Sequence, residues 1–308
     1  MFVDPNNKSI AVIDLGTNTF HLVLFRRTGK IVSEQYRKRH HVFLSQKGIK
    51  TIAESSIERA KDAILDFGKT LSTYHPDNTL IIGTEALRVA SNGPDLATFI
   101  EETLNAKVEV ISGKREAELI AKGVQWESKA PIDNALIMDI GGGSVEFIHI
   151  KNQEIKWLDS FPVGVGVLHN KFKHEEPIED EEVENLEDYL MNNCKSLVDY
   201  LASQEINYLI GASGSFELIS AIKQDKYPPE LTGNEVDIAD FWNIHNLILH
   251  SSLVDRLDMK GLPSQRAKLI VVAFILMGWI IRTMPATKLT ISKYAVKEGL
   301  VAEEFLDF

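Results

Sequence analysis

The chain begins with short apolar runs separated by polar turns, and this pattern predicts a sheet of strands. Residues 9–13 form an apolar run, and Phe20–Phe25 and Ile31–Tyr36 read as the two strands that follow it across tight turns. Residues 51–72 then repeat apolar side chains at the three- and four-residue spacing of a helix. Strands and helices continue to alternate beyond this point, which predicts an α/β protein.

The second half repeats the alternation and adds one strongly apolar segment. Residues 269–281 are apolar except for Gly278, which predicts a helix buried on all sides. The segment is shorter than the roughly 20 residues that span a membrane, so we expect no membrane helix. Further strands and helices are predicted at residues 79–83, 94–104, 108–111, 135–138, 154–167, 186–201, 208–210, 234–258, 288–292 and 295–305.

Two of the predicted strands end in the same kind of turn. Residues 14–19 read Asp-Leu-Gly-Thr-Asn-Thr, and residues 139–146 read Asp-Ile-Gly-Gly-Gly-Ser-Val-Glu. We interpret the two stretches as an internal repeat of one structural unit. Two such loops that faced each other across a cleft would grip a chain of phosphates from both sides. A third turn of small residues, Gly211–Ser215, also follows a strand.

The second of these turns has the composition of a phosphate site. The glycines Gly141–Gly143 allow the backbone to come close to a ligand, because no Cβ stands in the way. Their N–H groups and the Ser144 hydroxyl can form an anion-binding nest. Asp139 and Glu146 flank it, and carboxylate oxygens suit a hard cation such as Mg²⁺. The alternative is a glycine-rich hairpin with two unrelated acids.

Composition and charge narrow the class of protein. The chain has 308 residues, which suggests about two domains, and its 33 basic and 44 acidic residues give a net charge of −11. An acidic protein is a poor partner for a nucleic-acid polymer. The single cysteine, Cys194, fits a reducing compartment, and residues 1–8 lack the pattern of a signal peptide. We therefore expect a cytoplasmic protein.

Three charged positions are further candidates, each with a simpler alternative. The basic run Arg37–His41 would attract a polyanion to the first loop, or it forms a solvated face. Arg88 lies one turn into a short helix after Thr84, and an arginine fork binds two phosphate oxygens at once, although a surface salt bridge explains it equally. Glu116 follows the expected N-cap Ser112, where acidic side chains ordinarily complement the helix dipole.

Taken together, these stretches resemble a known architecture. The order of strands, glycine loops and helices is similar to the actin, sugar-kinase and heat-shock-chaperone ATPase fold. That fold has ribonuclease H-like mixed sheets flanked by helices, and its active site lies in an interdomain cleft. Within this group the chain resembles the exopolyphosphatase/guanosine pentaphosphate phosphohydrolase family over nearly its whole length. The matching segments are residues 11–26, 83–93, 108–124, 136–148, 160–168, 211–216 and 261–278.

The resemblance implies roles for individual residues. It places the catalytic base, which activates water, at Glu116, and a phosphate-contacting arginine at Arg88. It implies Mg²⁺ or Mn²⁺ held by Asp139 and Glu146, with Asp14 assisting through water. The implied phosphate-binding positions are Thr17, Asn18, Gly141, Gly142, Gly143, Ser144, Ser213 and Gly214. It also implies two actin-like domains, residues 1–121 and 122–296, with a C-terminal helix at about 297–308 that packs back on the first.

The implied activity is metal-dependent hydrolysis of the terminal phosphoanhydride of linear inorganic polyphosphate. The sequence departs from the family pattern at Arg115, at Ser264–Arg266 and at Ala295–Gly299, where the family usually has an acid, Pro-Glu-Arg and Gly-Leu-Arg-Glu-Gly. These departures leave the substrate preference open. Longer family members carry an extra helical domain, so we expect short polyphosphate chains to be favoured here.

Other functions remain open at this stage. Hydrolysis of the 5′-γ-phosphate of guanosine pentaphosphate is the near alternative. An ATP-dependent small-molecule kinase on the same scaffold would need an adenosine pocket near Gly211–Phe216. A non-enzymatic sensor of nucleotides or polyphosphate is disfavoured by the pair Glu116 and Asp139. A homodimer stays open as well, because symmetric dimers are the commonest oligomers, but no stretch of sequence marks an interface.

Overall fold

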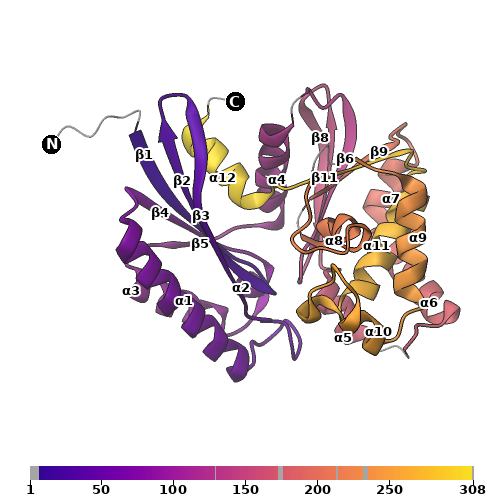
Figure 1. The fold of residues 1–308 in the computed structure, drawn as a ribbon, viewed down its shortest axis with the longest axis horizontal. Helices are drawn as coiled ribbons and strands as arrows, with labels where there is room; N and C mark the ends of the chain where they lie inside the picture. Colours follow the sequence, from indigo (N-terminus) through magenta and orange to yellow (C-terminus); the bar gives the residue numbers. More distant parts are fainter. Residues whose placement is uncertain (1–6, 129, 173–175, 213, 232–234, 307–308) are drawn as a thin grey trace.

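The computed structural model describes residues 7–128, 130–172, 176–212, 214–231 and 235–306, and it has two β-sheets side by side with helices around and between them (Figure 1). The first sheet has the strand order β3-β2-β1-β4-β5. In it, β1 runs antiparallel to β2 and parallel to β4. The strands are β1 (Asn7–Leu15), β2 (Thr19–Thr28), β3 (Ile31–His41), β4 (Asn78–Gly83) and β5 (Val108–Val110).

The second sheet repeats the first and adds one short strand. Its order is β10-β11-β9-β6-β7-β8, with β6 antiparallel to β7 and parallel to β9. The strands β8-β7-β6-β9-β11 therefore match β3-β2-β1-β4-β5 in order and direction, which confirms the predicted internal repeat. The strands are β6 (Asn134–Ile140), β7 (Val145–Lys151), β8 (Glu154–Phe161), β9 (Tyr208–Ala212), β10 (Glu235–Val236) and β11 (Lys288–Ser292).

Alternation along β1 and β2 gives the first sheet two buried faces. Ala11 and Ile13 face one side, in a core shared with α1 (Glu54–Tyr74) and α3 (Gly93–Leu104). Ile10 and Val12 face the other side and pack against Val301 of α12 (Val296–Phe305). The short helix α2 (Glu85–Val89) follows β4 directly. The α/β class and the mixed, helix-flanked sheets predicted from the sequence are confirmed.

The helices α4 (Gly113–Glu127) and α12 lie between the two sheets (Figure 1). They cross with their backbones in close contact. A Cβ on Gly123 would overlap the Ala295 carbonyl oxygen, and one on Gly299 would overlap that of Leu119. Only glycine allows this approach, so the crossing fixes the start of α12 against α4. The domain boundary predicted near residue 121 falls within α4.

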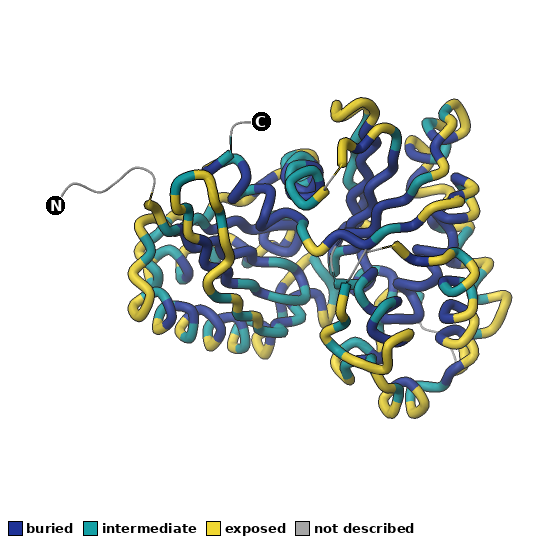
Figure 2. The backbone as a smooth tube through the Cα atoms, turned by 45° about the horizontal axis from the view of Figure 1, so that its top comes forward, coloured by how far each residue is buried: buried dark blue, intermediate teal, exposed yellow. Residues whose placement is uncertain are grey.

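The remaining helices surround the second sheet, and Figure 2 shows a buried interior in each half with exposed outer turns. The most apolar helix is buried from Ile270 to Ile281, as the sequence predicts. None of the described helices combines the length and apolar character needed to cross a membrane. These helices are α5 (Val165–Lys171), α6 (Asp180–Asn193), α7 (Lys195–Leu201), α8 (Gly214–Lys223), α9 (Ile238–Leu249), α10 (Leu253–Asp258) and α11 (Ile270–Thr283).

Several elements differ from the sequence-based expectation. The helix predicted at 186–201 is divided between α6 and α7 at Cys194. The described part of the stretch 234–258, predicted as one helix, holds the strand β10 followed by the two helices α9 and α10. The second helix begins anew at Ser252, whose hydroxyl accepts from the Asp255 N–H while the Asp255 carboxylate accepts from the Ser252 N–H. The strand β3 continues through the basic run to His41. Because strand side chains alternate, the run is divided between two faces: Lys38 and His40 both pair with Asp66.

Candidate active site

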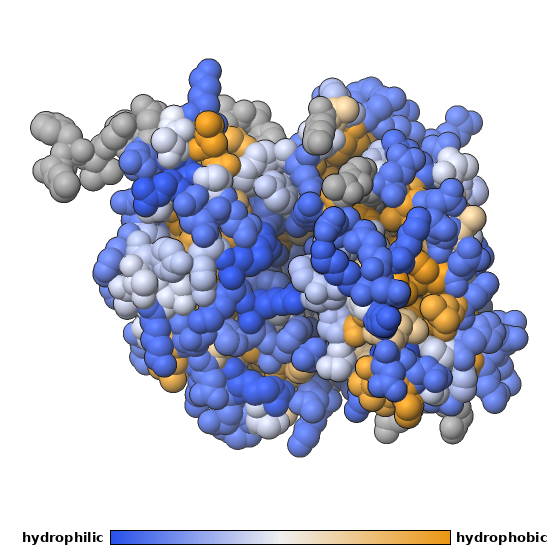
Figure 3. Space-filling model, viewed as in Figure 1, coloured by the Kyte–Doolittle hydropathy of each residue, from blue (hydrophilic) through white to orange (hydrophobic). Residues whose placement is uncertain are grey.

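A cavity of about 720 Å³ lies between the two halves, and hydrophilic residues line the hollow seen in Figure 3. Most of the residues singled out in the sequence meet there. Ser213 lies outside the described residues, and Arg88 is not among the residues that line the cavity. The predicted site residues in its lining are Asp14, Thr17, Asn18, Glu116, Asp139, Gly141, Gly142, Gly143, Ser144, Glu146 and Gly214.

The first loop, residues 14–19, is fixed by hydrogen bonds that its carbonyl groups accept from the segment 42–44. The Thr17 oxygen accepts a hydrogen bond from the Leu44 N–H at 2.7 Å, and the Asn18 oxygen accepts one from the Val42 N–H at 2.9 Å. In a trans peptide the carbonyl of one residue and the N–H of the next point in opposite directions. The N–H groups of Asn18 and Thr19 therefore point away from the 42–44 segment, on the cavity side of the loop.

The second loop is held in the same way. The carbonyl oxygens of Gly141, Gly142 and Gly143 accept hydrogen bonds from the N–H groups of residues 165, 166 and 164, at 3.0, 2.9 and 3.2 Å. By the same peptide geometry, the N–H groups of Gly142, Gly143 and Ser144 point away from this segment. Three consecutive N–H groups on one side of a loop form a nest for an anion.

The two loops approach each other so closely that glycine is required. A Cβ on Gly142 would lie 2.6 Å from the Asn18 Cγ, and one on Gly143 would lie 2.7 Å from the Glu85 Cγ. The two N–H nests thus open onto the same small space from opposite sides. The close approach of the two loops agrees with the facing arrangement that the sequence repeat suggests, and their grip on a phosphate chain stays a prediction.

A group of buried carboxylates lies beside the nests. Asp14 and Asp139 each lie one residue before the end of their strands, β1 and β6, and Glu146 on β7 is directly opposite Asp139 in the antiparallel register. The Glu146 Oε1 accepts hydrogen bonds from the hydroxyls of Ser144 at 2.6 Å and Ser160 at 2.7 Å. These two bonds fix the orientation of the Glu146 carboxylate.

The carboxylates raise one another's pKa. Burial raises the pKa of Asp14 to about 6, against the opposing charge of Lys297, and Asp139 adds to the rise. Burial and the charge of Asp139 raise the pKa of Glu146 to about 8, although the serine hydroxyls favour its ionised form. Negative groups packed in this way favour a cation between them.

Glu116 faces the same space from the first turn of α4. Its Oε2 is buried and has no hydrogen-bond partner within the described parts of the chain, and its nearest cation is the Arg88 Nη1 at 3.8 Å. The pKa of Glu116 is raised well above its usual value, first by burial and then by the charges of Glu146 and Asp14, whereas Arg88 lowers it. An unpartnered buried carboxylate oxygen beside an anion nest can accept a proton from a bound water.

The Arg88 guanidinium is already hydrogen-bonded to other protein groups. Its Nη1 donates to the Ile111 carbonyl oxygen at 2.5 Å, and its Nη2 donates to Glu85. In this arrangement Arg88 acts on Glu116 through its charge, and contact with a phosphate would require its side chain to move. The phosphate-contacting role implied by the resemblance stays a prediction.

The donor set fits a divalent cation that a ligand completes. Among the described residues, no three His, Cys, Asp or Glu side chains gather closely enough to hold a metal ion alone. Mg²⁺ is usually bound by one or two carboxylates together with waters and substrate phosphates. Asp139 and Glu146 would supply the carboxylates, and the mutual repulsion of these buried groups is what such a cation would relieve.

Sequence reasoning missed three residues of this site. Ser160 orients Glu146, Glu85 holds Arg88, and Lys297 lies opposite Asp14. Ser160 and Glu85 fall in segments that carry the resemblance, and Lys297 falls in a stretch that departs from the family pattern. The contacts of Ser160 and Lys297 join separate elements of the fold, which no local pattern shows.

The sequence of this chain is similar to those of known phosphatases. A family model described as the Ppx/GppA phosphatase family matches residues 29–308. A guanosine-5′-triphosphate,3′-diphosphate pyrophosphatase of Aeromonas salmonicida (strain A449) is 27% identical over 304 residues, covering 96% of this chain and 59% of that protein. Its counterpart in Aeromonas hydrophila is 28% identical over 300 residues, again 96% and 59%. This chain therefore spans about 59% of the length of these relatives.

Solved structures match the whole fold. The crystal structure of an exopolyphosphatase from Cytophaga hutchinsonii has a TM-score of 0.91 and 31% identity, covering 97% of this chain and 98% of that one. A family member from Aquifex aeolicus has a TM-score of 0.82 at 20% identity, over 97% and 98% of the two chains, which is a likeness of fold alone.

Proposed function

Because this chain belongs to the Ppx/GppA phosphatase family, we propose that it hydrolyses the terminal phosphoanhydride bond of a linear phosphate chain and releases orthophosphate. The observation that carries the proposal is the buried Glu116 Oε2, which accepts no hydrogen bond from the described residues and shares the cavity with the two N–H nests. The nests would hold the terminal phosphate, and Glu116 would hold the attacking water.

The chemistry follows from this placement. Glu116 takes a proton from the water, whose oxygen forms a bond to the terminal phosphorus while the bridging P–O bond breaks in line. The electron pair of the broken bond leaves with the shortened chain. The loop N–H groups stabilise charge on the phosphoryl oxygens without having to reorganise. A bound Mg²⁺ or Mn²⁺ on Asp139 and Glu146, with Asp14 close by, would supply positive charge to the same oxygens.

Inorganic polyphosphate of short chain length is the proposed substrate. The likeness to the Cytophaga hutchinsonii exopolyphosphatase, at 31% identity over 98% of that chain, supports this choice. A cavity of about 720 Å³ is the size of a small-ligand site, which suits a few phosphate units. The second candidate is guanosine pentaphosphate, supported by the names of the Aeromonas relatives.

Phosphate release from tripolyphosphate and from guanosine pentaphosphate, each with Mg²⁺, tests the proposal. We expect Glu116→Gln to lower turnover by about 10² or more while substrate binding is kept. Glu118→Gln is the matched control, because Glu118 lies on the same helix, forms an ion pair with Arg115 and has a side chain 47% exposed. Near-normal turnover by Glu116→Gln would reject Glu116 as the base. A strong preference for the nucleotide would reverse the order of the two substrates, and transfer to an acceptor hydroxyl in place of water would reject hydrolysis.

A further inference from the structure

One face of the first sheet changes from apolar to polar residues along its strands. Ile10 and Val12 on β1 lie under α12, and the next residue on that face is Asp14. On β2, Val23 is covered by α12 and the next residue on its face is His21, which pairs with Asp14 in register. The first turn of α12 therefore ends the apolar cover and borders the cavity.

Lys297 in that first turn is a cation with little protein partnership. Its residue is only 9% exposed and lines the cavity. Its Nζ lies 3.9 Å from the Asp14 Oδ2, too far for a hydrogen bond, and it makes none with the described residues. A nearly buried ammonium whose donors are unused by protein groups needs an acceptor in the cavity.

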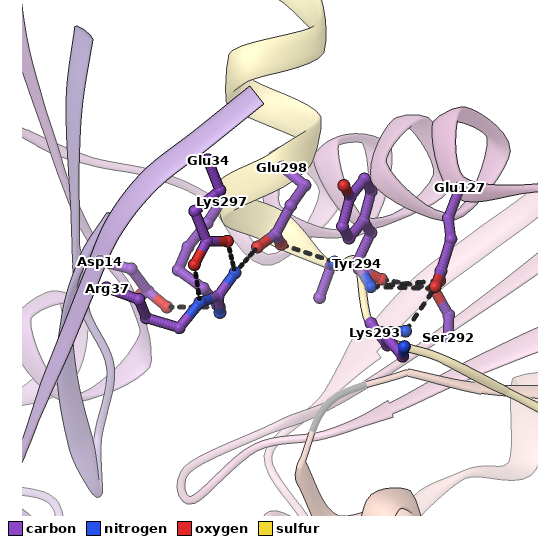
Figure 4. Close-up of polar contacts among 10 residues, drawn as sticks. Asp14, Glu34, Arg37, Glu127, Ser292, Lys293, Tyr294, Lys297 and Glu298 are labelled. Carbon is purple, nitrogen blue, oxygen red and sulfur yellow. Dashed lines mark hydrogen bonds and ion pairs between the residues drawn. The ribbon is translucent and has the colours of Figure 1, made fainter. Parts of the chain in front are cut away.

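The neighbouring Glu298 holds this turn in place (Figure 4). Glu298 is fully buried, and its carboxylate accepts hydrogen bonds from the Ala295 N–H at 2.9 Å and the Arg37 Nη2 at 2.8 Å. Arg37 is in turn fixed by Glu34, through its Nε at 3.0 Å and its Nη2 at 2.6 Å. Arg37 thus supplies a hydrogen bond to Glu298, whereas Lys297, whose charge also lowers the pKa of Glu298, lines the cavity.

The glycine crossing places Lys297 and Glu116 in the lining of the same cavity. Glu116 lies in the first turn of α4 and Lys297 in the first turn of α12, and both line the cavity. The backbone contacts at Gly123 and Gly299 prevent the two helices from shifting relative to each other. A group bound next to Asp14 would lie close to Lys297, in the cavity that Glu116 also lines.

The negative charge of the carboxylates that line the cavity requires a cation close to any bound phosphate. Asp14, Glu116, Asp139 and Glu146 all face the space that an anionic substrate must enter. Repulsion between unit charges is strong where water is excluded, so positive groups must lie close to the phosphate. Arg88 does not line the cavity, whereas Lys297 does, as do Arg37, Lys38, Arg39, Arg266 and Lys293. The Lys297 Nζ lies 3.9 Å from the Asp14 Oδ2, which places this cation beside the carboxylates.

On this basis, and resting on the proposed function, we propose that Lys297 is a further catalytic residue whose ammonium donates hydrogen bonds to the terminal phosphate. Glu298 is the positioning residue that holds it. The contact neutralises phosphoryl charge in the bound state and in the transition state, so losing it weakens both binding and turnover.

The test measures tripolyphosphate binding by calorimetry in the Glu116→Gln background, without turnover, and phosphate release in the otherwise unchanged chain. Lys297→Met is expected to weaken binding by at least about 10-fold, the scale of a charged hydrogen bond, and to lower kcat/KM by more. Lys297→Arg should restore most of both, and thermal unfolding checks that each variant is folded. Lys293→Met, at another lysine of the cavity lining, should have a smaller effect.

The outcomes separate the two proposals. Unchanged binding and turnover in Lys297→Met, or an equal loss in Lys293→Met, overturns the direct contact while wild-type hydrolysis still upholds the proposed function. Weakened binding in Lys297→Met together with no hydrolysis by the wild type rejects the function and keeps the phosphate contact. No tripolyphosphate binding to the Glu116→Gln protein rejects both.

Discussion

Gly143 in the second loop lies so close to Thr17 in the first that a Cβ on Gly143 would stand 2.8 Å from the Thr17 Oγ1. The two residues are 126 positions apart in the sequence numbering, and they belong to equivalent loops of the repeated unit. Both residues line the cavity, and their close approach brings the two loops together.

Replacing Gly143 by alanine is therefore expected to separate the loops. The added methyl group meets Thr17 and Glu85, and overpacking of this kind costs about 1–3 kcal/mol of unfolding free energy. Phosphate release should fall by at least about 10-fold, because displacement of the nests by a fraction of an ångström weakens phosphate positioning. Urea unfolding and the phosphate assay measure the two effects.

Gly68→Ala is the matched control for this substitution. Gly68 lies within α1, where a Cβ would meet the Leu104 Cδ2 at an ordinary 3.4 Å. Alanine is favoured over glycine in a helix by about 1 kcal/mol, so this variant should keep its activity and its stability. Equal losses in the two variants would contradict the special role of Gly143.

Stability should depend on pH through His245. Burial lowers the pKa of His245 from its usual 6.5 to about 4, and Arg282 adds to the fall although the Asn246 side chain opposes it. Between these values the unfolded chain binds a proton that the folded chain does not. The stabilisation that neutral His245 contributes to the free energy of unfolding is therefore fully present above about pH 6.5. It is lost as the pH falls toward 4, by up to about 3 kcal/mol in total.

Urea unfolding at pH 7.5 and pH 5 measures this effect. Because other groups also titrate, the relevant quantity is the difference between the wild type and His245→Gln, and it should shrink at the lower pH. His250→Gln is the control at an exposed histidine that follows the same helix. A difference that stays constant between the two pH values would exclude His245 as the cause.

Metal addition and removal should act on the buried carboxylates. Mg²⁺ is expected to raise the Tm, because a ligand at 100 times its Kd adds about 2.7 kcal/mol to the folded state. Chelation should abolish phosphate release, and added Mg²⁺ should restore it. Full activity after exhaustive chelation would remove the metal from the proposed mechanism.

Ser160→Ala refines the metal experiment. The Ser160 hydroxyl orients Glu146 from a neighbouring strand, and losing such a partner typically weakens metal binding by about 10- to 100-fold. The Mg²⁺ concentration that half-restores activity should rise accordingly. Ser203→Ala, at an exposed serine whose hydroxyl bonds only the neighbouring Tyr200 carbonyl and Gln204 side chain within the described parts of the chain, should leave that concentration unchanged.

The sequence by itself determined the elements and the loops. Periodicity located the strands, the buried helix 270–281 and the two Asp-Gly turns, because each of these depends on residues close together in the chain. The likeness of the two turns was sufficient to predict a repeated unit. The pattern did not predict the break before Ser252, where a local serine–aspartate cap outweighs helical spacing.

Only the tertiary structure decided which charged side chains lie beside the two loops. It placed Lys297 beside Asp14, 283 positions away in the numbering, and it placed Arg88 behind Glu116. These relations depend on the crossing of α4 and α12 at Gly123 and Gly299, a backbone contact between segments that no local pattern connects. Residue type and spacing specify strands and turns, whereas long-range packing specifies which charged side chains share one buried space.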